Sequence, residues 1–270
     1  MINILQTEFF RLKKSALFWA LMVVVFFLPL ITALFNVLSV SLLENLEIDI
    51  EIDAWEYIKT MDITGAALST LPNLSSDCAL FALICTSIFL SKEFSGGTFR
   101  NMLLANRSRK EVYLSFWLIA FTIGSIYLGV EFVSTLLFSG AIFGFGTMSA
   151  ANAVTACVVS LAMGVISVAF LQSIMCMFMF GTRKLSVALA CPLVICMVAP
   201  SLIYSFVEVF STFGTITETD MSWIPLYNLN LLDLTHIDGA LIGKILLYLI
   251  PLAALFGWLG WETFRKADLK

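Results

Sequence analysis

The chain has 270 residues, is 60% hydrophobic and only 13% charged, and has a mean hydropathy of +0.97 with a formal net charge of −4. Its apolar residues lie in blocks of about 20 or more, the length that crosses a bilayer as a helix, so the composition excludes a soluble globular protein. We therefore expect an all-α integral membrane protein, with residues 1–270 forming a single transmembrane domain of six spans.

The chain begins with a predicted amphipathic helix over residues 2–14. Its charged side chains lie mostly off an apolar stripe that recurs every three or four positions: Ile2, Leu5, Phe9, Leu12 and Ala16. This pattern is typical of a helix that lies in the membrane surface, and a frayed extension of the first span is the alternative. The apolar run that follows is about twice the 7 to 15 residues of a signal-peptide core, so we expect it to stay as an anchor.

The charged residues delimit the spans. Lys14 and Glu44 bracket the first apolar run, and Arg183 and Lys184 separate the fourth run from the fifth. We expect Pro192 and Pro200 to kink the fifth span. The predicted spans cover about 17–43, 71–91, 112–138, 153–180, 185–206 and 241–264.

Six spans place the termini and connections on two sides of the membrane, and the positive charge is distributed unevenly between these two sides. Of the fifteen basic residues, only Lys59 and Lys244 fall on one face, and the others lie on the face that carries both termini. Basic residues mark the cytosolic side, so we expect a multi-pass protein of the plasma membrane with both termini in the cytosol. Acidic residues instead gather in the first outer connection, from Glu44 to Asp62.

Residues for catalysis are scarce. The six cysteines lie in or beside apolar spans without a C-x-x-C pair, where cysteine behaves as a small hydrophobe. His236 is the only histidine, and no phosphate-binding G-x-x-x-x-G-K-[ST] motif is present. The sequence therefore indicates no catalytic residues, no metal site and no cofactor in this chain, and the energy for any work must come from elsewhere.

The connection between the second and third spans is the most elaborate feature of the predicted cytosolic face. Phe99, Met102 and Leu103 are spaced to form the apolar ridge of a short amphipathic helix, flanked by Arg100 and Arg107. Two adjacent glycines before it permit a sharp bend. A short helix joined at both ends to membrane spans is suited to contact a soluble protein. The alternative is a loop whose arginines meet lipid phosphates.

This connection contains the pattern Glu93…Gly97-Thr98-Phe99-Arg100…Ser108-Arg109. Together with the amphipathic first helix and the six spans, it resembles the permease subunits of type-2 ATP-binding cassette (ABC) exporters over essentially the whole chain. In that family the segment is a coupling helix that sits in a cleft of a separate ATPase subunit. One departure is that Phe116 and Trp117 occupy the start of the third span, where a basic residue often follows in the family.

The resemblance implies two ABC ATPase subunits that hold MgATP, a second permease subunit that is the same or a sister chain, and contacts with membrane lipids. It implies no nucleic-acid partner. The implied coupling residues are Glu93, Phe94, Gly97, Thr98, Phe99, Arg100, Met102, Leu103, Arg107 and Arg109.

Four polar residues in or beside the spans are candidates for a substrate path: Asp77, Glu131, Gln172 and Asn36. A charged side chain inside the bilayer is costly and so faces a cavity or a partner. Alternatives remain for each residue. Glu131 could lie at the outer headgroups, Asp77 could cap a helix, and the two amides could form hydrogen bonds between helices.

We expect an exporter that moves an amphiphilic substrate outward. The acidic outer connection favours cationic amphiphiles, so export of, or immunity to, an antimicrobial peptide is the first expectation, and drug or lipid efflux is the second. A membrane sensor or assembly subunit that transports nothing is the alternative. An intramembrane enzyme is disfavoured because paired catalytic residues are lacking.

Overall fold

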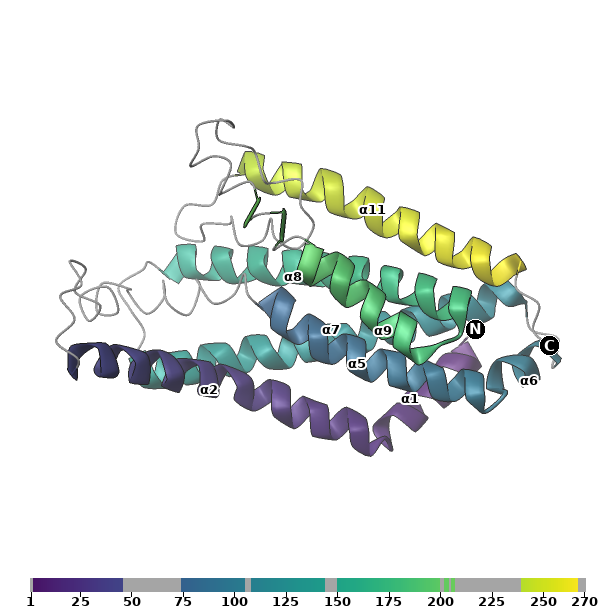
Figure 1. Cartoon of the computed structure of the whole chain (residues 1–270), viewed down its shortest axis with the longest axis horizontal. Helices are drawn as coiled ribbons and strands as arrows, with labels where there is room; N and C mark the ends of the chain where they lie inside the picture. Colours follow the sequence, from purple (N-terminus) through teal and green to yellow (C-terminus); the bar gives the residue numbers. More distant parts are fainter. Residues whose placement is uncertain are drawn as a thin grey trace.

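The computed structural model describes residues 2–45, 74–104, 108–143, 150–199, 202–203, 205–206 and 239–266. All regular secondary structure in these ranges is helical, which confirms the predicted all-α class. The long helices run side by side along the molecule, and α6, the start of α1 and the end of α11 lie at one end of it (Figure 1). The elements are α1 Ile2–Lys13, α2 Ala16–Asn45, α5 Leu74–Ser95, α6 Thr98–Leu104, α7 Arg109–Phe143, α8 Ala150–Thr182, α9 Leu185–Leu193, the π-helix η2 Val194–Val198 and α11 Gly239–Lys266.

Five helices in the described residues are long and apolar enough to cross a membrane: α2, α5, α7, α8 and α11. They coincide with the predicted first, second, third, fourth and sixth spans. The predicted fifth span, 185–206, is described in part as a shorter apolar helix, Leu185–Cys196. A sixth span therefore stays a prediction, and so does the kink at Pro200, which lies outside the described residues.

The helix geometry changes directly after Pro192. Pro192 lies inside α9, and the five residues of η2 follow it with a π-helical pattern, in which the Ala199 N–H donates to the Val194 carbonyl. Proline has no N–H to donate and its ring crowds the preceding turn, so the hydrogen-bond ladder is locally rearranged. The kink predicted at Pro192 stays a prediction.

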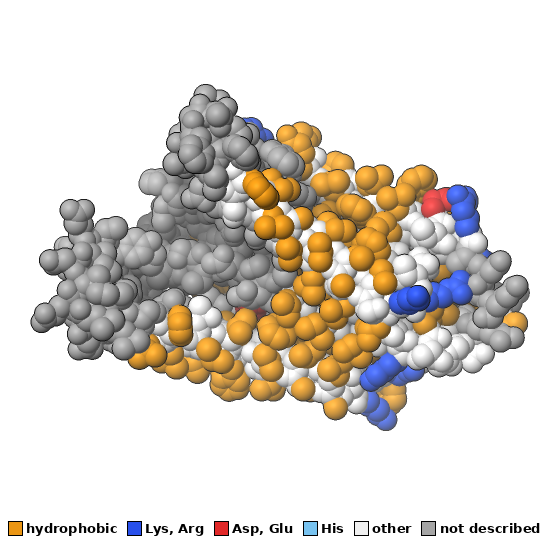
Figure 2. All heavy atoms as spheres, viewed as in Figure 1, with side chains coloured by type: hydrophobic (Ala, Val, Ile, Leu, Met, Phe, Trp, Pro, Cys, Tyr) orange, Lys and Arg blue, Asp and Glu red, His pale blue; other side chains and the backbone are white. Residues whose placement is uncertain are grey.

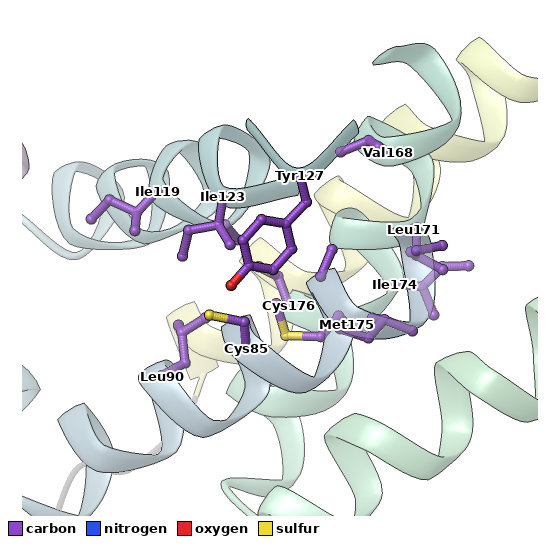
Figure 3. Packing of buried hydrophobic residues seen from close by; sticks show 14 of the residues in the cluster. Cys85, Leu90, Ile119, Ile123, Tyr127, Val168, Leu171, Ile174, Met175 and Cys176 are labelled. Atoms are coloured by element: carbon purple, nitrogen blue, oxygen red, sulfur yellow. The ribbon is translucent and has the colours of Figure 1, made fainter. Parts of the chain in front are cut away.

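α7 is the central helix of the bundle, because it packs against α1, α2, α5, α8 and α11. Around Tyr127 of α7, buried apolar side chains from α5 and α8 fill the space between the helices (Figure 3). The Tyr127 ring stacks on Phe18 of α2 at 5.5 Å, and its hydroxyl donates to the Phe18 carbonyl at 3.0 Å. Tyr127 therefore fixes α2 against the rest of the bundle.

The surface separates apolar and basic regions along the molecule. Large hydrophobic side chains are exposed along α2 and α11, and Figure 2 shows them covering the middle of one face. Among the described side chains, every Lys and Arg except Lys244 lies at the end that carries α6, which we call the basic end. An apolar belt with a basic end is the surface expected of a protein that sits in a bilayer.

α8 and α11 approach each other closely at Gly260. A Cβ atom placed there would lie 2.5 Å from the Tyr113 hydroxyl and 3.1 Å from Cα of Met177. The Tyr113 hydroxyl itself donates to the Gly257 carbonyl at 2.8 Å, so α7 also joins this contact. The absence of a side chain at Gly260 is what lets the three helices meet.

We predict that Gly260→Ala lowers the free energy of unfolding by about 1 to 3 kcal/mol, because the added methyl group overpacks a close backbone contact. Thermal unfolding of the purified protein in detergent measures this. Gly243→Ala is the matched control in the same helix, since a Cβ atom there would meet nothing within 4 Å. Equal melting temperatures for the two variants would contradict the prediction.

Candidate functional site

The turn between α5 and α6 depends on Gly97. Gly97 has φ of +68°, in the left-handed region that glycine adopts without strain. The Gly96 N–H donates to the Lys92 carbonyl at 2.9 Å, which ends α5, and the Asn101 N–H donates to the Gly97 carbonyl at 3.0 Å, which starts α6. The bend that the sequence predicts at the two glycines is therefore present, and Thr98 follows it as the first residue of α6.

The apolar ridge of α6 packs on the bundle instead of facing outward. Phe99 is only 2% exposed, and Met102 and Leu103 are partly buried against the same core. The exposed side of the helix carries Asn101 and Leu104, the latter 75% exposed. The predicted ridge is present, and within this chain it packs on the bundle. Its predicted contact with another protein stays a prediction.

Phe99 lies within a cluster of aromatic rings that joins the basic ends of four long helices. Its ring stacks on Phe94 of α5 at 4.1 Å and lies 4.4 Å from Phe116 of α7. Phe180 of α8 is 5.5 Å away and Phe264 of α11 is 6.2 Å away. With Tyr113, which lies 5.0 Å from Phe180, we call these six residues the aromatic cluster. Ring separations of this size are typical of favourable aromatic packing.

The start of α7 is held by Ser108 and Arg109. The Ser108 hydroxyl accepts a hydrogen bond from the Glu111 N–H at 3.2 Å, which is the geometry of a helix N-cap. The Arg109 guanidinium donates to the Arg265 carbonyl at the end of α11 at 2.6 Å. Both members of the Ser-Arg pair therefore have a local role in fixing the return from α6 into the bundle.

A buried ion-pair cluster fastens α1 to the end of α5. Arg11 Nη1 lies 2.6 Å from Glu93 Oε2 and 3.2 Å from Glu8 Oε1. Glu8 and Glu93 are almost completely buried, whereas the Arg11 side chain is 44% exposed. Burial and, to a lesser extent, the negative charge of Glu93 raise the pKa of Glu8, Arg11 lowers it, and the net pKa is about 7. Burial lowers the pKa of Arg11, but the hydrogen bonds and negative charges of the two carboxylates together raise it by more, so the guanidinium stays protonated.

The sequence pattern missed this cluster at Glu8 and Arg11. The stripe of apolar residues placed Glu8 on the polar side of α1, but the face that packs on the bundle comprises Ile4, Glu8 and Leu12. These residues recur at steps of four, which is the one signal that could have found Glu8. Glu8 is buried because of tertiary contacts that the local pattern does not reveal. Its carboxyl group lies beside Arg11 and the distant Glu93, and the ion pair with Arg11 offsets part of the cost of burying it.

The substrate-path candidates are not brought together into one described site. Gln172 of α8 is fully buried, near Gly124 of α7, where its Nε2 would lie 3.2 Å from an added Cβ atom. Glu131 is buried in α7 at a different level of the bundle. The helices that carry Asn36 and Asp77 are described, but their side chains lie outside the described part. The Arg100 side chain, Arg107 and the acidic outer connection beyond Asn45 also lie outside it.

Groups that could hold a metal ion are absent from the described residues, where no three His, Cys, Asp or Glu side chains come together. The six cysteines are all present as free thiols, and Cys78, Cys85, Cys176 and Cys196 are buried. The described features of the basic end are a short helix, an aromatic cluster and an ion-pair cluster.

Comparison with known proteins gives one family match. The sequence profile described as "ABC-2 family transporter protein" matches residues 4–199, which include α1, α6 and the first four predicted spans. No curated protein and no solved structure matches the chain.

We predict that Phe99→Ala destabilises α6 and its attachment by about 3 to 5 kcal/mol, because it leaves a cavity among five other rings. Leu104→Ala is the control on the exposed side of the same helix, with an expected change within about 0.5 kcal/mol. Thermal unfolding and the rate of proteolytic cleavage within α6 report the difference. Equal cleavage rates for the two variants would show that Phe99 does not anchor the helix.

Proposed function

Because this chain belongs to the ABC-2 transporter family, of which it is a membrane subunit, we propose that it exports an amphiphilic substrate by coupling its helices to separate ATPase subunits. The membrane domains of this family lack ATPase activity, and ABC-2 permeases pair with ATPase subunits in general. The finer proposal has three parts: a coupling site at the basic end, an outward direction and a class of cargo.

The coupling site is the segment from Lys92 to Lys110. The observation that carries this proposal is the burial of Phe99 in the aromatic cluster, because it links α6 to α5, α7, α8 and α11 at once. A displacement of α6 therefore acts on all four helices. In this proposal Phe94, Phe99, Met102 and Leu103 transmit the displacement, and the exposed side of α6 receives it from the ATPase.

The chain acts as one of two permease subunits, paired with itself or with a sister chain, and two ATPase subunits bind MgATP below it. Both termini and the coupling segment face the cytosol in this arrangement. It is supported by the gathering of the described Lys and Arg side chains at the basic end, which fits the positive-inside rule.

The proposed cargo is a cationic amphiphile, with an antimicrobial peptide first and a drug or lipid second. The support is the acidity of the connection between Glu44 and Asp62, which would attract cations at the outer face. A sensor or assembly subunit is the competing function. Stimulation of ATP hydrolysis by cationic peptides in a reconstituted complex separates the two, because a subunit that transports nothing gives no stimulation.

We predict that Arg100→Glu uncouples ATP hydrolysis from export while the protein still inserts, because in this proposal the Arg100 guanidinium pairs with acidic groups on the ATPase. The measurement is cargo moved per ATP hydrolysed in proteoliposomes that contain both subunits. Lys184→Glu makes the same change of charge at the basic end, in the turn between α8 and α9, and should behave like the wild type. Normal export by Arg100→Glu would contradict the docking proposal.

We further propose that Glu131 senses cargo when α7 and α8 move apart. Glu131→Gln should then lower the export rate or change the cargo profile, with little change in melting temperature, because it removes a charge and keeps the side-chain volume. Thr135→Val, one turn further along α7 and also buried, is the uncharged control. An unchanged cargo profile for Glu131→Gln would leave the carboxylate without a transport role.

A further inference from the structure

We propose that Glu8, Arg11 and Glu93 form a proton-binding clasp that positions the first helix α1 on the coupling segment. The functional consequence rests on the proposed coupling role of residues 92–110, whereas the clasp itself is a property of this chain. Glu8 and Arg11 come from α1, and Glu93 lies four residues before the Gly97 turn.

The geometry requires one guanidinium to serve two carboxylates. Arg11 Nη1 is 2.6 Å from Glu93 Oε2 and 3.2 Å from Glu8 Oε1, so the two carboxylates lie within about 6 Å of each other, the range in which one charge shifts the pKa of another. Of the two carboxylates, that of Glu93 lies closer to the Arg11 guanidinium. Both carboxylates are buried, and with both ionised the cluster would keep one negative charge without a matching cation.

The surroundings offer no other described charge to balance that carboxylate. α2 carries no charged residue from Ser15 to Leu43, and on α7 Arg109, Lys110 and Glu111 lie in the first turn, where Arg109 binds the α11 carbonyl instead. On α5, Lys92 points to solvent beside the buried Glu93. Among the described residues, the charges that shift the pKa of Glu8 are those of Glu93 and Arg11.

A proton supplies the missing positive charge. Burial and Glu93 hold the pKa of Glu8 at about 7, compared with 4.5 for an unburied glutamate. The protonated form of Glu8 leaves a neutral Arg11–Glu93 pair, and Arg11, which is half exposed, gives the cluster access to solvent at the basic end. At a pH well above 7 the ionised Glu8 repels Glu93, and the clasp between α1 and α5 loosens.

The sign of the pH effect follows from this shift. The folded state binds the Glu8 proton more tightly than the unfolded chain, so its stabilising contribution is complete below pH 4.5 and is lost as the pH rises through 7. Glu8→Gln imitates the protonated side chain and does not titrate. The wild type and this variant should therefore be equally stable at pH 4, and the variant should be the more stable of the two at pH 8.

The decisive experiment uses the purified full-length chain without an ATPase, so that its result is independent of the proposed function. Thermal unfolding from pH 4 to pH 9 should give a wild-type minus Glu8→Gln stability difference that grows between about pH 4.5 and pH 7 and is constant at higher pH, because only in that interval does the folded state hold a proton that the unfolded chain has lost. Infrared difference spectra of the folded protein should show a protonated-carboxyl band that disappears with a midpoint near pH 7 and is missing in Glu8→Gln. A stability difference independent of pH, or a band that is unchanged by Glu8→Gln, would overturn the proposal.

Two further variants sharpen the assignment. Glu93→Gln removes the neighbouring negative charge and should move the midpoint to lower pH. Glu262→Gln removes a carboxylate that is paired with Arg265 at the same end of the molecule, at 2.9 Å, and should leave the midpoint unchanged. If Glu8 titrated with the same midpoint in Glu93→Gln as in the wild type, the proposal that Arg11 serves both carboxylates would be overturned.

The positioning role is tested in the assembled transporter. Cargo moved per ATP hydrolysed should fall between pH 6.5 and pH 8 in the wild type and stay level in Glu8→Gln, because only the wild-type clasp opens. The same pH profile in both proteins, with the infrared band behaving as expected, would overturn the positioning role.

Discussion

The packing of Phe99 among the basic ends of four long helices is the constraint on which the rest of the site depends. α6 has only seven residues, too few for a helix that is stable in water by itself. Its shape is therefore imposed by Gly97 at one side, by the Ser108 cap at the other and by Phe99 in the middle. A helix held in this way moves with the bundle, which is what a coupling element requires.

The ion-pair cluster adds a second attachment of a different kind. Aromatic packing tolerates small sliding movements, because many weak contacts are exchanged for similar ones. An ion pair at 2.6 Å between Arg11 and Glu93 is more specific, and it connects the end of α5 to a helix that continues directly into the first span. Since Tyr127 also fixes α2 to the bundle, the two contacts together hold α1 and α2 in place relative to the end of α5.

The sequence predicts most of the fold because charged residues are costly in a bilayer, so they mark where spans can end. The five long apolar helices agree with that prediction. What the sequence could not predict is which neighbour each face meets. The spacing of Phe99, Met102 and Leu103 identifies an apolar ridge, but the same ridge would serve either a partner or the chain itself. Glu8 shows the same limit, since its burial depends on Glu93, which is 85 residues away in the chain.

The buried polar residues of the bundle constrain where a cargo could pass. Gly124 and Gly164 lie where a Cβ atom would come within 3.0 Å of side chains on the facing helix, so α7 and α8 are in close contact. Gln172 and Glu131 are enclosed by this packing. A large amphiphile could reach them only if these helices separate, whereas the outer faces of α2 and α11 already present apolar surface. In the proposed arrangement of two permease subunits, a route between the subunits therefore requires less disruption of the packing than a route through one subunit.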